Sequence, residues 1–221
     1  MAKEKELYSI VIIGGMNPRI HHPSWYRFMD LISPEELEEA VVSPLTFIIP
    51  PMGQFQSSHL TVTCQEERWE IKTNDSEQVQ RIIDLTSRLF DDLLPHTPVT
   101  AAGFNFHFRR ETKREDVAEY LASLLVKTPL GLTSKNIASG EMTLRRNSKD
   151  NMSFVTIKSS PSASKWIHTH HNFEYKFIAP DTNPGYFKLG KIFAERFACD
   201  RSDAEEQTKR IIEAINDSIE V

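Results

Sequence analysis

The chain has 221 residues, of which 39% are hydrophobic and 26% are charged, and its formal net charge is −5. This composition is typical of a globular protein, and a chain of this length can bury a core without disulfides or metals. No apolar run reaches the length of about 18 residues that a membrane-spanning helix needs. Two cysteines, Cys64 and Cys199, make no disulfide framework, so we expect free thiols and a cytoplasmic location.

The first part of the chain predicts strands and helices separated by proline-rich turns. A β-branched run ending at Gly14-Gly15 predicts a buried strand, and Ser33-Pro34-Glu35-Glu36 has the residues of a capping box, which predicts a helix start. In chain order we expect a strand at 7–13, a loop leading into a short helix at 17–32, a helix from Ser33 that ends before Pro44, and a strand at 45–49.

Alternating apolar and polar residues predict a hairpin of two strands, at 60–64 and 69–73. A stripe of apolar residues at helical spacing then predicts a helix at 76–94. The hairpin side chains expected to face inward are Leu60, Val62, Cys64, Trp69 and Ile71.

The remaining elements are a phenylalanine-rich strand at 99–109, a helix at 112–126, strands at 141–146, 152–158 and 166–178, and helices at 186–197 and 202–219. We expect loops or turns at 127–139, 147–151 and 159–165. Together these elements predict a single α+β domain over residues 1–221. It would have two layers, with helices on one face of a mainly antiparallel sheet of about seven strands.

Two of the expected helices have similar sequences. Residues 77–84 and 206–213 are identical at five of eight positions. One interpretation is an internal β-β-α duplication, with halves at 1–110 and 111–221. The alternative is that amphipathic helices share good helix formers by chance.

The expected strand at 166–178 carries an unusual polar face. Residues two apart in a strand share a face, so Trp166, His168, His170 and Glu174 would point together. If the strand at 99–109 is its neighbour, His107 joins them. Such a set could form a subunit interface, bind a divalent metal for hydrolysis, or serve general acid–base chemistry. The alternative is a solvated strand face.

The charge is unevenly distributed along the chain. Residues 98–170 hold 11 Lys/Arg and 6 Asp/Glu, a net charge of +5, which leaves −10 for the remainder. A basic segment with aromatic residues can bind nucleic acid or another polyanion. The candidate residues for that binding are Arg109, Arg110, Arg145 and Arg146.

The segment 17–26 is rich in proline, histidine and aromatic residues, so it is a candidate recognition loop. Its candidate residues are Arg19, His21, His22 and Trp25. The alternative is a structural plug whose aromatic side chains fill the edge of the core.

Two stretches resemble an uncharacterised bacterial protein family. They are Gly15–Tyr26, with Asn-Pro-x-Ile followed by Pro-x-Trp-Tyr, and Thr97–Phe108, with Thr-Pro-Val-x-x-x-Gly-Phe-Asn-Phe-His-Phe. The resemblance covers about half the chain and implies a bacterial cytosolic origin. It implies no activity and no catalytic residue.

The residue patterns therefore favour a protein that is not an enzyme. Gly-x-Ser-x-Gly and Cys-x-x-Cys motifs are absent from the sequence. The leading hypothesis is a non-catalytic interaction or assembly subunit that forms a homo-oligomer or binds a protein partner. The alternatives are a metal-dependent hydrolase and a polyanion-binding protein. No membrane partner and no cofactor other than that metal are expected.

Overall fold

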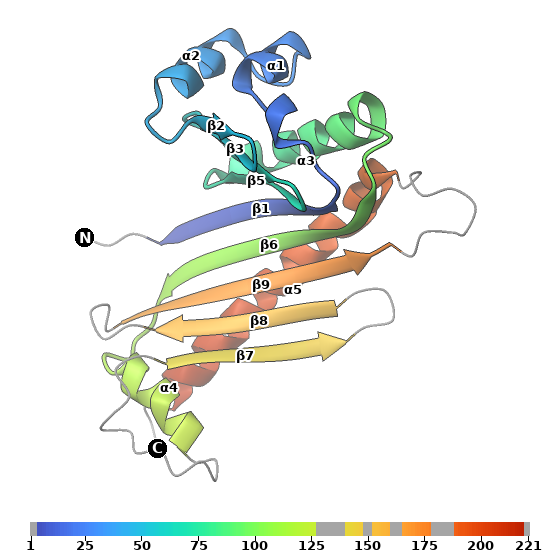
Figure 1. Ribbon diagram of the computed structural model, residues 1–221. Helices are drawn as coiled ribbons and strands as arrows, with labels where there is room; N and C mark the ends of the chain where they lie inside the picture. The colour runs from blue at the N-terminus through green and yellow to red at the C-terminus, as the bar shows by residue number, and fades with distance from the viewer. Residues whose placement is uncertain (1–3, 127–139, 148–151, 160–164, 178–187, 219–221) are drawn as a thin grey trace. The chain divides into compact units, whose positions relative to one another are not determined.

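A computed structural model describes residues 4–126, 140–147, 152–159, 165–177 and 188–218 (Figure 1). Nine strands among these residues form one open antiparallel sheet, accompanied by α-helices, so the predicted α+β class is confirmed. The strand order is β2-β3-β4-β5-β1-β6-β9-β8-β7. None of the helices within these ranges is long and apolar enough to cross a membrane.

The strands are β1 (Lys5–Gly14), β2 (Phe47–Ile49), β3 (Met52–Gln56), β4 (Thr61–Gln65), β5 (Arg68–Thr73), β6 (Val99–Glu111), β7 (Gly140–Asn147), β8 (Met152–Ser159) and β9 (Trp166–Lys176). The α-helices are α1 (Pro23–Phe28), α2 (Pro34–Val42), α3 (Val79–Ser87), α4 (Val117–Val126) and α5 (Leu189–Asp217). Short 3-10 turns lie at Pro18–Ile20 and Ser76–Gln78, and α3 continues as a π-helix over Arg88–Leu93.

The chain divides into two compact units. Unit 1 comprises Met1–Glu6, Phe106–Phe173 and Cys199–Val221, and unit 2 comprises Leu7–Asn105 and Glu174–Ala198. The strands β1, β6 and β9 and the helix α5 contribute residues to both units. The single domain and its two sequence halves stay predictions.

In unit 2 the strand register aligns buried side chains in two rows, one across three strands and one across four. One row runs from Ile12 through Trp69 to Cys64, and all three side chains are fully buried. The other row consists of Ile10, Ile71, Val62 and Phe55. The predicted hairpin and its inward-facing residues are therefore confirmed.

Helices of unit 2 cover the face that carries these rows. From the π-helix after α3, Phe90 packs edge-to-face on Trp69, with ring centroids 5.2 Å apart. From α5, Phe193 and Phe197 pack on Phe104, at 5.1 and 4.9 Å between ring centroids. The carboxylate of Asp91 accepts the backbone N–H groups of Leu189 and Gly190, both at 2.8 Å, and so fixes the start of α5.

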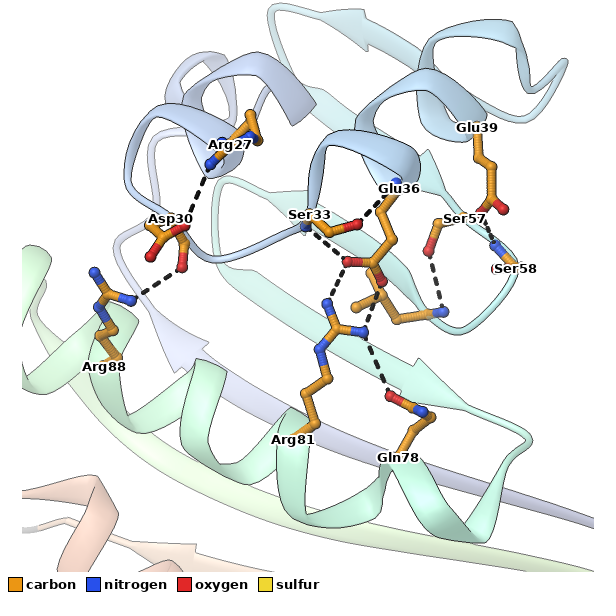
Figure 2. Close-up of polar contacts among 11 residues, drawn as sticks. Arg27, Asp30, Ser33, Glu36, Glu39, Ser57, Ser58, Gln78, Arg81 and Arg88 are labelled. Carbon is orange, nitrogen blue, oxygen red and sulfur yellow. Dashed lines mark hydrogen bonds and ion pairs between the residues drawn. The ribbon is translucent and has the colours of Figure 1, made fainter.

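The helices α2 and α3 are joined by a buried carboxylate (Figure 2). Ser33 Oγ accepts the Glu36 N–H at 3.2 Å, and Glu36 Oε2 accepts the Ser33 N–H at 2.9 Å, which confirms the predicted capping box. The same carboxylate receives two hydrogen bonds from the guanidinium of Arg81 on α3. The Glu36 residue is only 5% exposed, so its charge depends on these donors.

Unit 1 has its own core between the sheet and two helices. It contains Ile157 of β8, Ile167 of β9 and Ile215 of α5, together with Val117 and Leu121 of α4. Next to this core, Thr208 of α5 forms 2.8 Å hydrogen bonds with the buried Thr169 and with Nε2 of the buried His171. The helices α4 and α5 therefore pack on the side of β9 that carries Ile167, Thr169 and His171.

Four expectations about individual elements were wrong. The helix predicted from residue 112 begins at Val117, as α4. Strand β3 was not predicted, because Gly53 and two glutamines have low strand propensity, and its pairing with β2 and β4 outweighs that preference. Strand β2 begins at Phe47 instead of residue 45. The last two predicted helices, at 186–197 and 202–219, are one helix, α5. The predicted loops at 127–139, 147–151 and 159–165 lie almost entirely outside the described residues.

The order of elements bears on the predicted duplication. A long strand, β1 or β6, is followed each time by helical segments, a run of antiparallel strands and a further helix, but β6 lies almost entirely within the predicted first half, 1–110. The strand order places β1 beside β6, with the hairpin strands of each half outside them. The two similar segments lie mainly in α3 and in α5, and the duplication stays a prediction.

Candidate functional site

The polar face predicted for β9 lies on the side of unit 1 opposite α4 and α5. Because strand residues alternate, the buried Ile167, Thr169 and His171 face the helices, and the residues between them face away. The same alternation applies to β6, which is the neighbour of β9. We call this side the outer face of unit 1. On β6 and β9 it includes His107, Arg109, Trp166, His168 and His170.

The first pair on the outer face is Arg109 with Trp166. The guanidinium carbon of Arg109 lies 4.6 Å from the centroid of the Trp166 ring, a cation–π geometry. Arg109 Nε is buried, and it has no hydrogen-bond partner among the described residues. Both residues are half-buried, so the pair presents a large flat surface that carries a positive charge.

The second pair on the outer face is His107 with His170. Their rings stack with centroids 4.0 Å apart and an interplanar angle of 8°. The lone pair of an imidazole nitrogen lies in the plane of its ring. In two parallel, stacked rings the lone pairs therefore lie in two separate planes and do not converge on one ion. Among the described residues, no group of three or more His, Cys, Asp or Glu side chains could hold a metal ion. This geometry argues against the predicted metal site.

The third histidine, His168, lies beside Arg109. Burial, and to a lesser degree the positive charge of Arg109, hold the pKa of His168 below its ordinary value of 6.5. This imidazole is therefore neutral at pH 7. A neutral imidazole can donate and accept hydrogen bonds at a contact without the desolvation cost of a charge.

The outer face continues onto β8 and β7. Lys158 and Glu141 form an ion pair at 2.9 Å, and the Thr143 and Thr156 hydroxyls are 2.9 Å apart. The guanidinium carbon of Arg145 lies 5.8 Å from the centroid of the Phe154 ring, which repeats the cation–ring motif of β6 and β9. The face therefore carries charges of both signs between aromatic groups.

The structure divides the predicted polyanion set. Arg109 and Arg145 lie on the outer face, but Arg110 points to the opposite side of β6. There Arg110 forms ion pairs with Glu6 and Glu4 and lies over the Phe108 ring. Arg146 lies in β7 opposite Ser153, and its side chain is outside the described atoms. The four arginines therefore do not form one basic surface.

Glu174 belongs to unit 2, where it forms an ion pair with Lys176 at 3.6 Å. Of the five residues predicted as an interface or metal site, the outer face of unit 1 contains the other four. Sequence reasoning did not predict that Arg109 packs on Trp166 or that Phe154 packs with Arg145. The alternation of polar residues in 141–146 and 152–158 could have indicated that Arg145 and Phe154 share a face.

The predicted recognition loop has one buried member. His21 is 1% exposed, whereas Arg19 and His22 are exposed and Trp25 is half-buried. His22 caps α1, because its Nδ1 accepts the Ser24 N–H at 3.1 Å. The loop therefore contains a structural part, as the plug interpretation expects, and one inward-facing imidazole.

His21 ends a chain of hydrogen bonds that begins in the sheet. Trp69 Nε1 donates to the Tyr26 hydroxyl at 2.9 Å, and that hydroxyl lies 2.8 Å from His21 Nδ1. Trp69 and Tyr26 are fully buried. Burial lowers the pKa of His21 to about 4 and raises the pKa of Tyr26 well above 10, so both groups are neutral at pH 7.

Comparison with models of known protein families gives no match, and comparison with curated proteins gives none either. The resemblance to an uncharacterised bacterial family therefore stays a prediction. The case for the candidate residues therefore depends on the geometry of the two units.

Proposed function

We propose that this protein is a non-catalytic assembly subunit that associates with a second copy of itself through the outer face of unit 1. The observation that carries the proposal is the Arg109–Trp166 pair, which is half-buried and already ordered within one chain. Arginine and tryptophan are enriched among the residues that dominate binding energy at interfaces. A preordered pair loses less side-chain entropy when it is covered.

A second copy is the partner that the charges of this face favour. Contacts related by a two-fold axis bring the same surface patch against itself, so that patch must be self-complementary. The outer face offers cations at Arg109, Arg145 and Lys158 and a carboxylate at Glu141, together with the imidazole of His168, whose pKa is lowered. A polyanion would instead favour one sign of charge, and the opposite orientation of Arg110 weakens that alternative.

Truncation of the tryptophan should separate the subunits. In Trp166→Ala the contact loses its largest apolar surface, so we expect self-association to weaken at least about tenfold. Sedimentation velocity over a range of micromolar concentrations measures the change. A matched control is Phe28→Ala, which truncates an aromatic residue of unit 2 that is 82% exposed.

The wild type and Phe28→Ala should sediment as the same oligomer at a concentration where Trp166→Ala is a monomer. Circular dichroism should show all three proteins folded. A wild type that is monomeric throughout the range would overturn the proposal, and so would a Trp166→Ala protein that associates like the wild type.

A further inference from the structure

The second feature of interest lies in unit 2, where the hydrogen-bond chain of Trp69, Tyr26 and His21 has a defined direction. The indole Nε1 can only donate, so the Tyr26 oxygen accepts from it. The Tyr26 hydroxyl hydrogen then has His21 Nδ1 as its acceptor. This arrangement places the proton of the neutral imidazole on Nε2. His21 therefore has one N–H donor, at Nε2, for which the described residues provide no acceptor.

His21 also lines a cavity of about 320 Å³. The walls come from two segments that are distant in the sequence, one before α1 and one after the π-helix. The lining residues are Gly15, Met16, Asn17, Ile20 and His21 from the first segment, and Leu93, Leu94, Pro95, His96, Thr97 and Pro98 from the second. Both stretches that the sequence singled out, Gly15–Tyr26 and Thr97–Phe108, contribute to this wall.

The two walls are tied by the backbone. The Gly15 N–H donates to the Pro98 carbonyl at 3.2 Å. A Cβ at Gly14 would lie 2.3 Å from the same carbonyl oxygen, so the chains approach here more closely than any other residue permits. The cavity is therefore built on a fixed scaffold and not on a pair of independent loops.

The chemistry of the lining restricts what can bind. Its side chains are mainly apolar, and none of the lining residues is an aspartate, glutamate, lysine or arginine. A charged ligand would lose its hydration here without gaining a counter-ion. Within the described part of the chain, Nδ1 is the ring nitrogen of His21 that has a hydrogen-bond partner, which leaves the Nε2–H to meet a ligand.

We infer that this cavity is a binding site for a neutral small molecule with an apolar body and a carbonyl group that accepts the His21 Nε2–H. The volume falls in the range of small-molecule sites, which are typically apolar with a few fixed polar groups. The donor is preordered, since Trp69 and Tyr26 fix both the ring and its tautomer. This site is in unit 2, so it is independent of the proposed self-association of unit 1.

A matched pair of probes tests the inference on the wild-type protein. Acetophenone has a phenyl ring and a carbonyl acceptor, and α-methylstyrene has the same shape with a CH₂ group in place of the oxygen. We expect acetophenone to bind with a Kd of about 1 mM, as suits a ligand of its size, and about fivefold more tightly than α-methylstyrene. Titration by NMR, following the backbone amides of Gly15, Met16 and Thr97, measures both affinities.

Two further measurements separate ligand recognition from simple apolar filling. The ¹⁵N shifts of His21 should report an Nε2–H tautomer, and its Nε2–H proton should move on addition of acetophenone. In Leu94→Trp, which fills the cavity from a half-buried position, both probes should lose binding. Equal affinities for the two probes, an Nδ1–H tautomer, or amide shifts that persist in Leu94→Trp would each overturn the inference.

Discussion

Acidification from pH 7 to pH 4 should lower the free energy of unfolding by about 3 kcal/mol for each of two buried histidines, His21 and His171. Burial lowers the pKa of each to about 4, and at His171 the nearby His170 adds to the shift. In the unfolded chain both titrate near 6.5, so between these values the unfolded state binds more protons. Stability is therefore full above pH 6.5 and is lost as the pH falls toward 4.

Urea denaturation at a series of pH values measures this loss, and His171→Gln is the informative variant. Glutamine can keep a hydrogen bond to Thr208 but does not titrate. Over this pH range we expect the free energy of unfolding of His171→Gln to fall by about 3 kcal/mol less than that of the wild type. The carboxylates contribute equally to both proteins, so the difference reports His171. Parallel pH profiles for the two proteins would contradict the assignment of a neutral, buried His171.

The second large effect concerns the carboxylate between α2 and α3. Arg81→Met should cost about 3 kcal/mol at pH 7, because it leaves Glu36 buried without its charged partner. The Arg81 side chain is 34% exposed, which places the effect at the lower end of the range for buried pairs. Denaturant unfolding at neutral pH measures the cost, and a loss below about 1 kcal/mol would contradict a buried ion pair.

A double variant and a change of pH test the cause of that cost. In Glu36→Gln with Arg81→Met the N-cap bond can persist, since glutamine serves in a capping box, but no charge is buried. This double variant should be more stable than Arg81→Met alone. In the wild type burial raises the pKa of Glu36, but Arg81 and the Ser33 N–H outweigh it, so the pKa is lowered. Without Arg81 burial dominates, so the cost of Arg81→Met should shrink as the pH falls to 4 and Glu36 takes a proton.

The sequence predicted well the elements that bury one face and expose the other. The hairpin of β4 and β5 and the strand β9 alternate between buried and more exposed residues, because one side of each packs under helices. In β6 residues 101–106 are all buried, and the alternation is confined to the residues that follow. Strand β3 lacks this alternation of apolar and polar residues at Gly53. Its position in the sheet depends on pairing with the neighbouring strands. The helix α5 was predicted as two helices, at 186–197 and 202–219, whereas the structure has one helix over Leu189–Asp217.

The candidate site was predicted in part. Alternation alone placed His168 and His170 together on one face, but their meeting with His107 and Arg109 depended on β6 being the neighbour of β9. That pairing joins two strands that are distant in the sequence. The sequence analysis could only assume that they are neighbours. The inward turn of His21 was beyond prediction, because its cause is a hydrogen bond to Tyr26 that is itself held by Trp69.

The most direct test of the proposed assembly follows Trp166 itself. The chain has three tryptophans, Trp25, Trp69 and Trp166, so incorporation of 5-fluorotryptophan gives a fluorine resonance for each. We predict that the Trp166 resonance moves as the protein is concentrated from micromolar to millimolar, while those of Trp25 and Trp69 stay in place. The shift should be lost in Arg109→Ala, which removes the cation above the ring. A Trp166 resonance that does not change with concentration would contradict self-association through the outer face.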